Sequence, residues 1–227
     1  MPERDRPETD TNEIGPSDAE AAFARWLFAQ PCRFFAGAAS EDRLPPSEVP
    51  EVAFVGRSNV GKSSLVNALT GQKTLAKVSR TPGRTQQINF FDLTGRLTLV
   101  DLPGYGYAKA AKSSIDSWTQ LTQRYLKGRR GLERVMILID GRHGLKASDR
   151  AVMAALDEAA RPYQLILTKG DLVKASAREA LLAAVSEEAA SYRAAHPEVL
   201  LTSAEKGLGL EALRLSAATL ASPPSRD

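Results

Sequence analysis

The 227-residue sequence has a single cysteine, Cys32, so it has no disulfide framework and too few thiols for a cysteine-ligated zinc site. No apolar run approaches the roughly 18 residues that a membrane-spanning helix needs. The first ten residues, MPERDRPETD, lack the apolar core of a signal peptide, and the last residues lack a prenylation motif. We therefore expect a cytoplasmic protein with no membrane partner.

The sequence also has little excess charge of either sign. It contains 30 lysines and arginines against 27 aspartates and glutamates, which gives a net charge of +3. Nucleic-acid-binding proteins often carry a larger excess, so this value is compatible with RNA binding without indicating it. An ordinary solvated surface is the simpler interpretation of the charge.

The chain divides into a main domain and flanking segments. Residues 1–16 are polar and are expected to form a disordered tail. Ser17 and Glu20 form a capping-box pattern that predicts the start of a helix, which Pro31 ends. We interpret 17–50 as an N-terminal helix and linker, 51–221 as the main domain and 222–227 as a C-terminal tail.

Strand-like runs alternate with helical patterns after residue 50. We expect strands near 52–56, 87–93, 96–102, 134–140, 163–168 and 199–203, and helices near 61–69, 112–127, 147–160, 175–195 and 209–221. This alternation predicts a three-layer α/β fold with a mostly parallel six-stranded sheet and helices on both faces. Thr94-Gly95 between two of the runs predicts one antiparallel edge hairpin.

A glycine-rich segment, GRSNVGKS, occupies residues 56–63 between an expected strand and an expected helix. It matches the pattern G-x-x-x-x-G-K-[ST], in which backbone amides surround the phosphates of a nucleotide. Lys62 would reach the β- and γ-phosphates, and the Ser63 hydroxyl would bind Mg²⁺. A glycine turn with a surface lysine is a much weaker explanation, because the strand and helix context also fits.

The segment DLPG, residues 101–104, follows another expected strand. Asp101 could hold Mg²⁺ through a water molecule, and the Gly104 amide could meet the γ-phosphate. The pattern D-x-x-G is weak alone, but after a phosphate loop and a strand it favours a nucleotide switch.

The segment TKGD, residues 168–171, ends a further expected strand. Asp171 could accept hydrogen bonds from N1–H and the 2-amino group of guanine, which adenine lacks. The aliphatic stem of Lys169 could cover the base. A plain helix cap at Asp171 is the structural alternative, but the order of the motifs favours guanine over adenine.

Two further elements complete the predicted site. The segment TSA, residues 202–204, could give backbone amides to guanine O6, although it is the least specific motif. A switch threonine should bind Mg²⁺ and the γ-phosphate in the GTP state only. We choose Thr85 over Thr81, since Thr85 lies just before a strand and Thr81 precedes a proline.

The strings GRSNVGKSSLVNAL, TPGRTQQINFF, LVDLPGYGYA and TKGD together resemble the EngB family (also called YihA or YsxC) of bacterial ribosome-biogenesis GTPases, within the Era-like P-loop GTPases. The resemblance covers roughly residues 31–220, and we identify 51–221 as an EngB-type GTPase domain. It implies GTP and GDP binding with Mg²⁺, a monomer, and a role with rRNA in assembly of the large ribosomal subunit. Family members are also linked to cell division, since depletion affects septation, an effect that can be indirect.

The resemblance also assigns the nucleotide site residue by residue. Lys62, Thr85 and Gly104 become the catalytic residues, and Ser63 and Thr85 become the Mg²⁺ ligands. The nucleotide-binding residues become Gly56, Arg57, Ser58, Asn59, Val60, Gly61, Lys62, Ser63, Gly83, Arg84, Thr85, Gln86, Gln87, Asp101, Leu102, Pro103, Gly104, Thr168, Lys169, Gly170, Asp171, Thr202, Ser203 and Ala204.

The position after D-x-x-G holds Tyr105, where Ras-like enzymes carry the glutamine that orients the attacking water. One interpretation is slow intrinsic hydrolysis that the ribosome stimulates. Another is help from K⁺, because Asn59 matches an asparagine of potassium-stimulated relatives; a turn residue is the alternative for Asn59. For Tyr105 and Tyr107 we favour packing inside the protein over stacking on RNA.

Basic residues cluster at the end of the helix near 112–127 and in the loop after it: Arg124, Lys127, Arg129, Arg130 and Arg134. They could contact rRNA, or they could serve solubility and the helix C-terminus. The leading function is a GTP-dependent switch on the large ribosomal subunit. The alternatives are a stand-alone Era-like GTPase with a non-ribosomal partner, a GTP/GDP-binding module with negligible turnover, and an ATPase or kinase, which Asp171 and Lys169 disfavour.

Overall fold

The structure, a computed structural model, describes residues 17–76, 87–105 and 120–222. The helices are α1 (Asp18–Ala29), α2 (Lys62–Leu69), α3 (Gln120–Gly128), α4 (Ala147–Glu158), α5 (Ala175–Ala189) and α6 (Leu210–Ala218). The strands are β1 (Cys32–Ala38), β2 (Glu51–Gly56), β3 (Ile88–Leu93), β4 (Leu97–Asp101), β5 (Leu132–Asp140), β6 (Tyr163–Thr168) and β7 (Leu200–Leu201). Two short 3₁₀ helices are η1 (Glu41–Arg43) and η2 (Gly170–Leu172).

The strands form one sheet in the order β1-β3-β4-β2-β5-β6-β7. β4, β2, β5, β6 and β7 are parallel to one another, whereas β1, β3 and β4 form an antiparallel edge. The predicted hairpin joins β3 to β4, and Thr94 and Gly95 both adopt the positive φ that tight hairpin turns use.

The described residues form a sheet of seven strands, so the predicted count of six is wrong. The missed strand is β1, which lies inside the segment that we interpreted as a linker. Its sequence, CRFFAGA, lacks the clean apolar-polar alternation by which a strand is recognised. β1 is an edge strand, and its pairing with β3 changes register between Phe34 and Ala36. Pairing with β3, more than 50 residues later in the chain, creates this strand.

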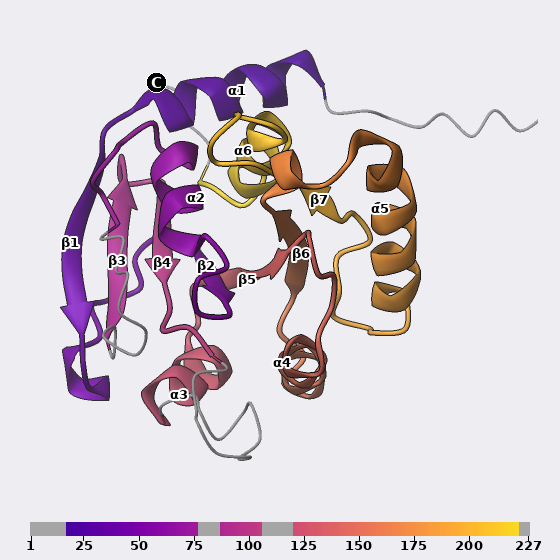
Figure 1. Ribbon diagram of the computed structural model, residues 1–227. Coiled ribbons are helices and arrows are strands. Elements are labelled where there is room, and N and C mark those ends of the chain that lie inside the picture. The colour runs from indigo at the N-terminus through magenta and orange to yellow at the C-terminus, as the bar shows by residue number, and fades with distance from the viewer. Residues whose placement is uncertain (1–16, 77–86, 106–119, 223–227) are drawn as a thin grey trace, which may run out of the picture.

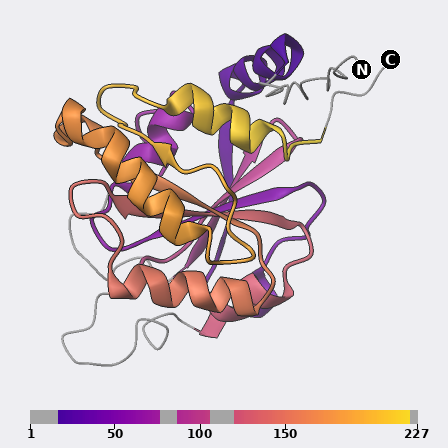
Figure 2. The ribbon, with the colours of Figure 1, turned by 90° about the vertical axis from the view of Figure 1, so that its right-hand side faces the viewer.

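Helices cover both faces of the sheet, as the alternation predicts (Figures 1 and 2). On one face, α1, α2 and α6 bury a cluster that includes Leu27, Leu65 and Leu213. On the other face, α3, α4 and α5 bury a second cluster. The fold is therefore a three-layer α/β sandwich. Along the described parts of the chain, no helix combines the length and apolar character needed to cross a membrane.

The N-terminal helix begins as its capping box predicts. The Ser17 hydroxyl accepts from the Glu20 amide, and the Glu20 carboxylate accepts from the Ser17 amide at 2.8 Å. Its apolar side packs against α6. The adjoining Cys32 is buried, and burial raises the pKa of its thiol to about 12. Cys32 is therefore packed in the interior, where the thiol form is favoured over the thiolate.

Candidate nucleotide-binding site

The glycine-rich loop connects the carboxyl end of β2 to the N-terminus of α2, which begins at Lys62. A side chain on Gly56 would put its Cβ 2.8 Å from Val60 Cγ1 and 2.9 Å from the Leu138 carbonyl, so the position accepts only glycine without rearrangement. Gly61 caps α2 with a φ of 100°. The loop therefore leads into a helix N-terminus, where backbone amides favour an anion.

Lys62 and Asp101 form an ion pair between the glycine-rich loop and the end of β4. The two residues lie 39 positions apart in the sequence, and both side chains are largely buried. This pair brings together the predicted phosphate-binding lysine and the predicted Mg²⁺-associated aspartate.

The DLPG segment lies directly against the glycine-rich loop. The Tyr105 amide donates to the Gly56 carbonyl at 3.2 Å, and the Ser58 amide donates to the Tyr105 carbonyl at 3.4 Å. A Cβ on Gly104 would lie 3.1 Å from the Gly56 carbonyl oxygen, tighter than ordinary contact, so glycine favours this close approach. The backbone contacts tie the start of the predicted switch to the phosphate loop.

The Tyr105 side chain is buried, and its hydroxyl donates to Asp149 Oδ1 at 2.8 Å. Burial raises the pKa of Tyr105 and also that of Asp149. The prediction of a packed tyrosine is confirmed for Tyr105, whereas Tyr107 lies outside the described residues. A phenol held in the protein interior cannot orient a water molecule at a phosphate.

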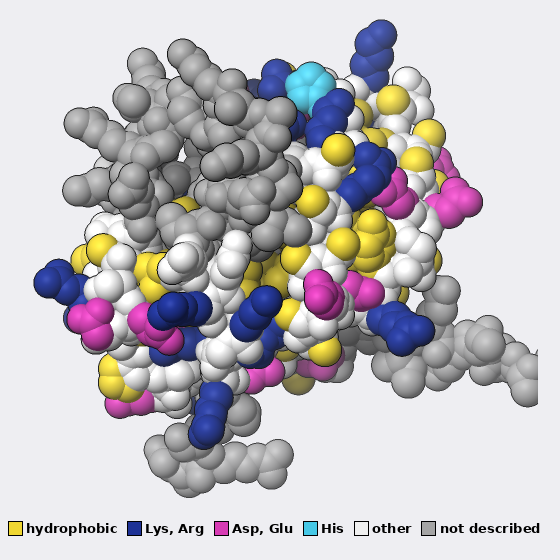
Figure 3. Space-filling view, turned by 90° about the horizontal axis from the view of Figure 1, so that it is seen from below, with side chains coloured by type: hydrophobic (Ala, Val, Ile, Leu, Met, Phe, Trp, Pro, Cys, Tyr) yellow, Lys and Arg dark blue, Asp and Glu magenta, His cyan; other side chains and the backbone are white. Residues whose placement is uncertain are grey.

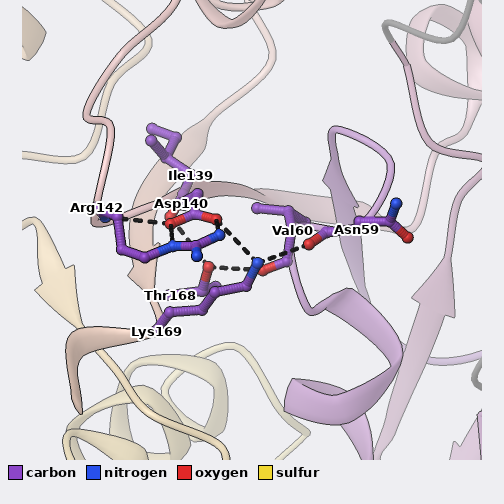
Figure 4. Close-up of polar contacts among 7 residues, drawn as sticks. All are labelled: Asn59, Val60, Ile139, Asp140, Arg142, Thr168 and Lys169. Atoms are coloured by element: carbon purple, nitrogen blue, oxygen red, sulfur yellow. Dashed lines mark hydrogen bonds and ion pairs between the residues drawn. The ribbon is translucent and has the colours of Figure 1, made fainter. Parts of the chain in front are cut away.

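Hydrogen bonds connect the TKGD segment to the other motifs. The Thr168 hydroxyl donates to the carbonyl of Val60 at 2.7 Å and to that of Ile139 at 3.1 Å (Figure 4). The Gly170 amide donates to the Thr202 carbonyl at 2.8 Å. Thr168 thus fixes the phosphate loop, and Gly170 fixes the TSA segment, relative to the end of β6.

A cavity of about 400 Å³ opens between these segments. Its lining includes the glycine-rich loop and the start of α2, both ends of the TKGD segment, and the end of TSA: Val60, Gly61, Ser64, Lys169, Asp171 and Ala204. Val60 and Gly61 of the predicted phosphate loop and the predicted base-reading Asp171 therefore line one cavity. No other described residue forms a hydrogen bond or ion pair with the Asp171 carboxylate.

Other predicted site residues are not tested by these contacts. Gly83, Arg84, Thr85 and Gln86 lie outside the described residues. Gln87 is exposed just before β3, and its side-chain amide donates to Asn89 Oδ1 at 3.1 Å.

The basic cluster of the sequence does not form one free positive surface. Arg129 forms a bidentate ion pair with the buried Glu51, and Arg124 pairs with Glu41. Arg134 bonds to Gln164 and Ser216 inside the fold, and burial lowers its pKa. Figure 3 views the face with α3 and α4, where basic and acidic side chains are interspersed over the described part. These arginines have structural partners.

Sequence reasoning missed Asp140, which ends β5 next to Thr168 on β6. Its carboxylate accepts from Lys169 Nζ at 2.8 Å and from the Arg142 guanidinium at 2.7 and 2.9 Å (Figure 4). The available signal was its position: a polar residue at the carboxyl end of a buried parallel strand lies at the ligand-binding edge of an α/β sheet.

The fold, the strand-to-helix phosphate loop and the shared cavity define a P-loop GTPase. The family model described as "50S ribosome-binding GTPase" matches residues 51–169, more than half of the chain. A probable GTP-binding protein EngB from Rhodospirillum rubrum is 52% identical, over 96% of this chain and 99% of the relative. A probable EngB from Gluconobacter oxydans is also 52% identical, over 92% of each chain. This chain belongs to the EngB family of GTP-binding proteins, which is implicated in ribosome biogenesis.

Solved structures support the fold alone. The crystal structure of a probable GTP-binding protein EngB matches with a TM-score of 0.54 and 20% identity, over 74% of this chain and 97% of that one. Aquifex aeolicus Era bound to GDP and AlF4⁻ matches with a TM-score of 0.56 and 21% identity, over 78% of this chain. The match spans only 58% of the Era chain.

Proposed function

We propose that this chain is a switch that hydrolyses GTP to GDP and phosphate and acts, as a cytoplasmic monomer, in assembly of the large ribosomal subunit. The observation that carries the nucleotide part is the single cavity lined by Gly61 and Asp171. The ribosomal part is supported by the matching family model. A link to septation would follow indirectly from impaired ribosome supply.

Base recognition is assigned to Asp171 and Ala204. The Asp171 carboxylate would accept from N1–H and the 2-amino group of guanine. The amides of Thr202 and Ser203 already donate to the carbonyls of Leu167, at 2.7 Å, and Leu208, at 2.9 Å. The Ala204 amide, at the cavity wall, is therefore the donor that we assign to guanine O6. An adenine base would leave these polar groups unpaired, at a cost of about 1–3 kcal/mol each.

Phosphate binding is assigned to the backbone amides of the glycine-rich loop and to the Lys62 ammonium. The phosphates would compete with the Asp101 carboxylate for this ammonium. The oxygen donors of Ser63 and Asp101 suit Mg²⁺, which proteins commonly bind through one or two side chains together with substrate phosphates. The ion would neutralise charge on the β- and γ-phosphates. Gly104 would donate its amide to the γ-phosphate, and we keep Thr85 as the further Mg²⁺ ligand of the GTP state.

Hydrolysis joins a water oxygen to the γ-phosphorus, breaks the bond to the β–γ bridging oxygen and releases GDP, with the water protons passing to the products. Because Tyr105 is buried against Asp149, we expect slow intrinsic turnover that the ribosome stimulates. K⁺ would be a second source of positive charge if it bound near Asn59, whose side chain points away from Lys169 (Figure 4). Among the fold neighbours, NFeoB from S. thermophilus was solved with GDP, AlF4⁻ and K⁺. Turnover should be faster in KCl than in NaCl, and equal rates would exclude the ion.

The nucleotide assignment is tested by exchanging the base and the residue together. Asp171→Asn should bind GDP at least tenfold more weakly and xanthosine diphosphate more tightly, because an asparagine amide can donate to the 2-carbonyl of xanthine. Isothermal titration with both nucleotides measures the exchange. Unchanged GDP affinity in the variant would contradict the assignment of Asp171.

The ribosomal assignment is tested by co-sedimentation with purified large subunits, with a non-hydrolysable GTP analogue or with GDP. Binding in the GTP form alone supports the switch, and Thr85→Ala should then remove the difference. Absence of binding in both states would favour an Era-like GTPase with a non-ribosomal partner. GTP hydrolysis followed over hours, with and without subunits, distinguishes an enzyme from a binding module without turnover.

A further inference from the structure

The carboxylate of Asp140 lies between two cations at the ligand-binding edge of the sheet. Its Oδ2 accepts from Lys169 Nζ at 2.8 Å and from Arg142 at 2.7 Å, and its Oδ1 accepts from the Arg142 side chain and backbone at 2.9 and 3.1 Å. The side chain is only 15% exposed, against 41% for Arg142. Burial acts to raise the pKa of Asp140, but the hydrogen bonds from Arg142 and Lys169 hold it well below the usual range.

Lys169 connects Asp140 to the phosphate loop. The same ammonium that binds Asp140 also donates to the Asn59 backbone carbonyl at 2.8 Å (Figure 4). Lys169 also lines the cavity between the loop and Asp171. One lysine therefore touches both the predicted phosphate-binding and the predicted base-binding parts of the site.

Both ends of this contact have an unfavourable backbone conformation. Asn59 and Lys169 are non-glycine residues with φ values of 65° and 58°. Such conformations are sparsely populated by non-glycine residues and persist where the surroundings hold them. The hydrogen bond between these two residues, with Asp140 as the counter-charge, holds both loops together.

We propose that Asp140 is a positioning residue for the nucleotide, which acts by holding the Lys169 ammonium against the Asn59 carbonyl. The inference rests on the proposed function, because it concerns the same nucleotide site. In this arrangement the lysine stem stays extended along the cavity wall, ready to cover a base. Loss of the Asp140 charge frees the ammonium and so loosens the phosphate loop and the base-covering stem together.

The experiment measures GDP affinity and dissociation rate with a fluorescent GDP derivative in the full chain. Asp140→Asn keeps the shape of the side chain and should weaken GDP binding about tenfold, which corresponds to about 1.4 kcal/mol, mostly through faster dissociation. The matched control is Arg142→Gln, which removes the other partner of Asp140 and should change affinity less than twofold.

A double-mutant cycle separates positioning from a general effect on folding. Because Asp140 acts through Lys169, adding Asp140→Asn to Lys169→Met should cause no further loss of affinity. The proposal would be overturned if the double variant lost affinity by the product of the two single losses. It would also be overturned if Asp140→Asn bound GDP with wild-type affinity. If Asp140→Asn does not fold, Asp140→Glu moves the carboxylate by one methylene group and should give a severalfold loss, and unchanged affinity there would also overturn it.

The outcomes for the proposed function are distinct. A wild-type chain that fails to bind GDP would overturn the nucleotide assignment itself. A wild-type chain that binds GDP, with affinity insensitive to Asp140, would overturn only the positioning role.

Discussion

Both ends of the central strands carry ion pairs between a carboxylate and a basic side chain, but the pairs at the two ends have different surroundings. At the amino end of β2, Glu51 accepts two hydrogen bonds from Arg129 Nε and one from the Tyr125 hydroxyl at 2.8 Å. Its side chain is 2% exposed, and the Arg129 guanidinium lies over the rings of Phe90 and Tyr125. Arg129 Nη2 also donates to Glu51 Oε1 at 2.6 Å, and carbonyls of the preceding proline-rich segment accept two further Arg129 bonds.

At the carboxyl end of the same sheet, one of two ion pairs borders a cavity. Lys62 pairs with Asp101 beside the phosphate loop, and Lys169 pairs with Asp140. Lys169 is 26% exposed and lines the cavity together with Asp171. Its partners therefore leave part of the side chain accessible.

The difference teaches that a carboxylate with a basic partner is not a functional signal in itself. Around Glu51, side chains of the protein occupy the positions that a ligand would need, so the pair stabilises the fold. Lys169, by contrast, lines a cavity that a ligand can enter. The carboxyl ends of the strands provide that space because the connecting loops diverge there.

The largest expected effect is at the amino end. Arg129→Met leaves Glu51 buried without its cation and should lower the free energy of unfolding by about 3–5 kcal/mol. Urea denaturation measures the loss, and the GDP affinity of the folded fraction should be unchanged. The double variant with Glu51→Gln should lose less than Arg129→Met alone. A loss in GDP affinity would break the proposed separation of the two ends.

The next largest effect on stability is expected at the buried Tyr105. Tyr105→Phe removes the hydroxyl that donates to Asp149 and should lower the free energy of unfolding by about 1–3 kcal/mol. Thermal and urea denaturation of the two proteins measure it, and unchanged stability would show that the bond contributes little.

The hydrogen-bonded pair of Tyr105 and Asp149 also predicts that the free energy of unfolding depends on pH. Burial raises the pKa of Asp149 in the folded protein, so between its ordinary and raised pKa values the folded chain holds this proton more tightly than the unfolded chain. Stability relative to Asp149→Asn should therefore increase as the pH falls into that window. Urea denaturation at several pH values measures the difference, and a flat difference would contradict the burial argument.

A smaller effect is expected at the carboxyl end. Ser63→Ala should weaken GDP binding about tenfold in the presence of Mg²⁺, or about 1.4 kcal/mol, and have little effect with a chelator. Within the described ranges the Ser63 side chain has no hydrogen bond, so stability without nucleotide should change by less than about 0.5 kcal/mol. Equal losses with and without Mg²⁺ would argue against the metal role of Ser63.

The smallest effect is expected for the surface pair of Arg124 and Glu41, whose side chains are 62% and 58% exposed. Arg124→Ala should change the free energy of unfolding by less than about 1 kcal/mol, because solvent screens the pair. Co-sedimentation of the variant with large subunits tests the rRNA role in addition. A strong loss of subunit binding would restore the basic cluster as an interface.

Local sequence determined the parts of this protein that depend on neighbouring residues. The capping box at Ser17, the turn at Gly95 and the glycines of the phosphate loop act within a few positions, so their patterns are visible in the sequence. The alternation of strands and helices then predicts the layers and places each motif at the carboxyl end of a strand.

Contacts between distant residues were decided only by the tertiary structure. β1 exists as a strand because β3 pairs with it, and Arg129 is structural because the fold brings it to Glu51, 78 positions away. Asp140 pairs with Lys169, 29 positions later, because the fold places the ends of β5 and β6 side by side. A sequence pattern identifies residue types and spacing, whereas burial and pairing decide which charges remain available to a ligand.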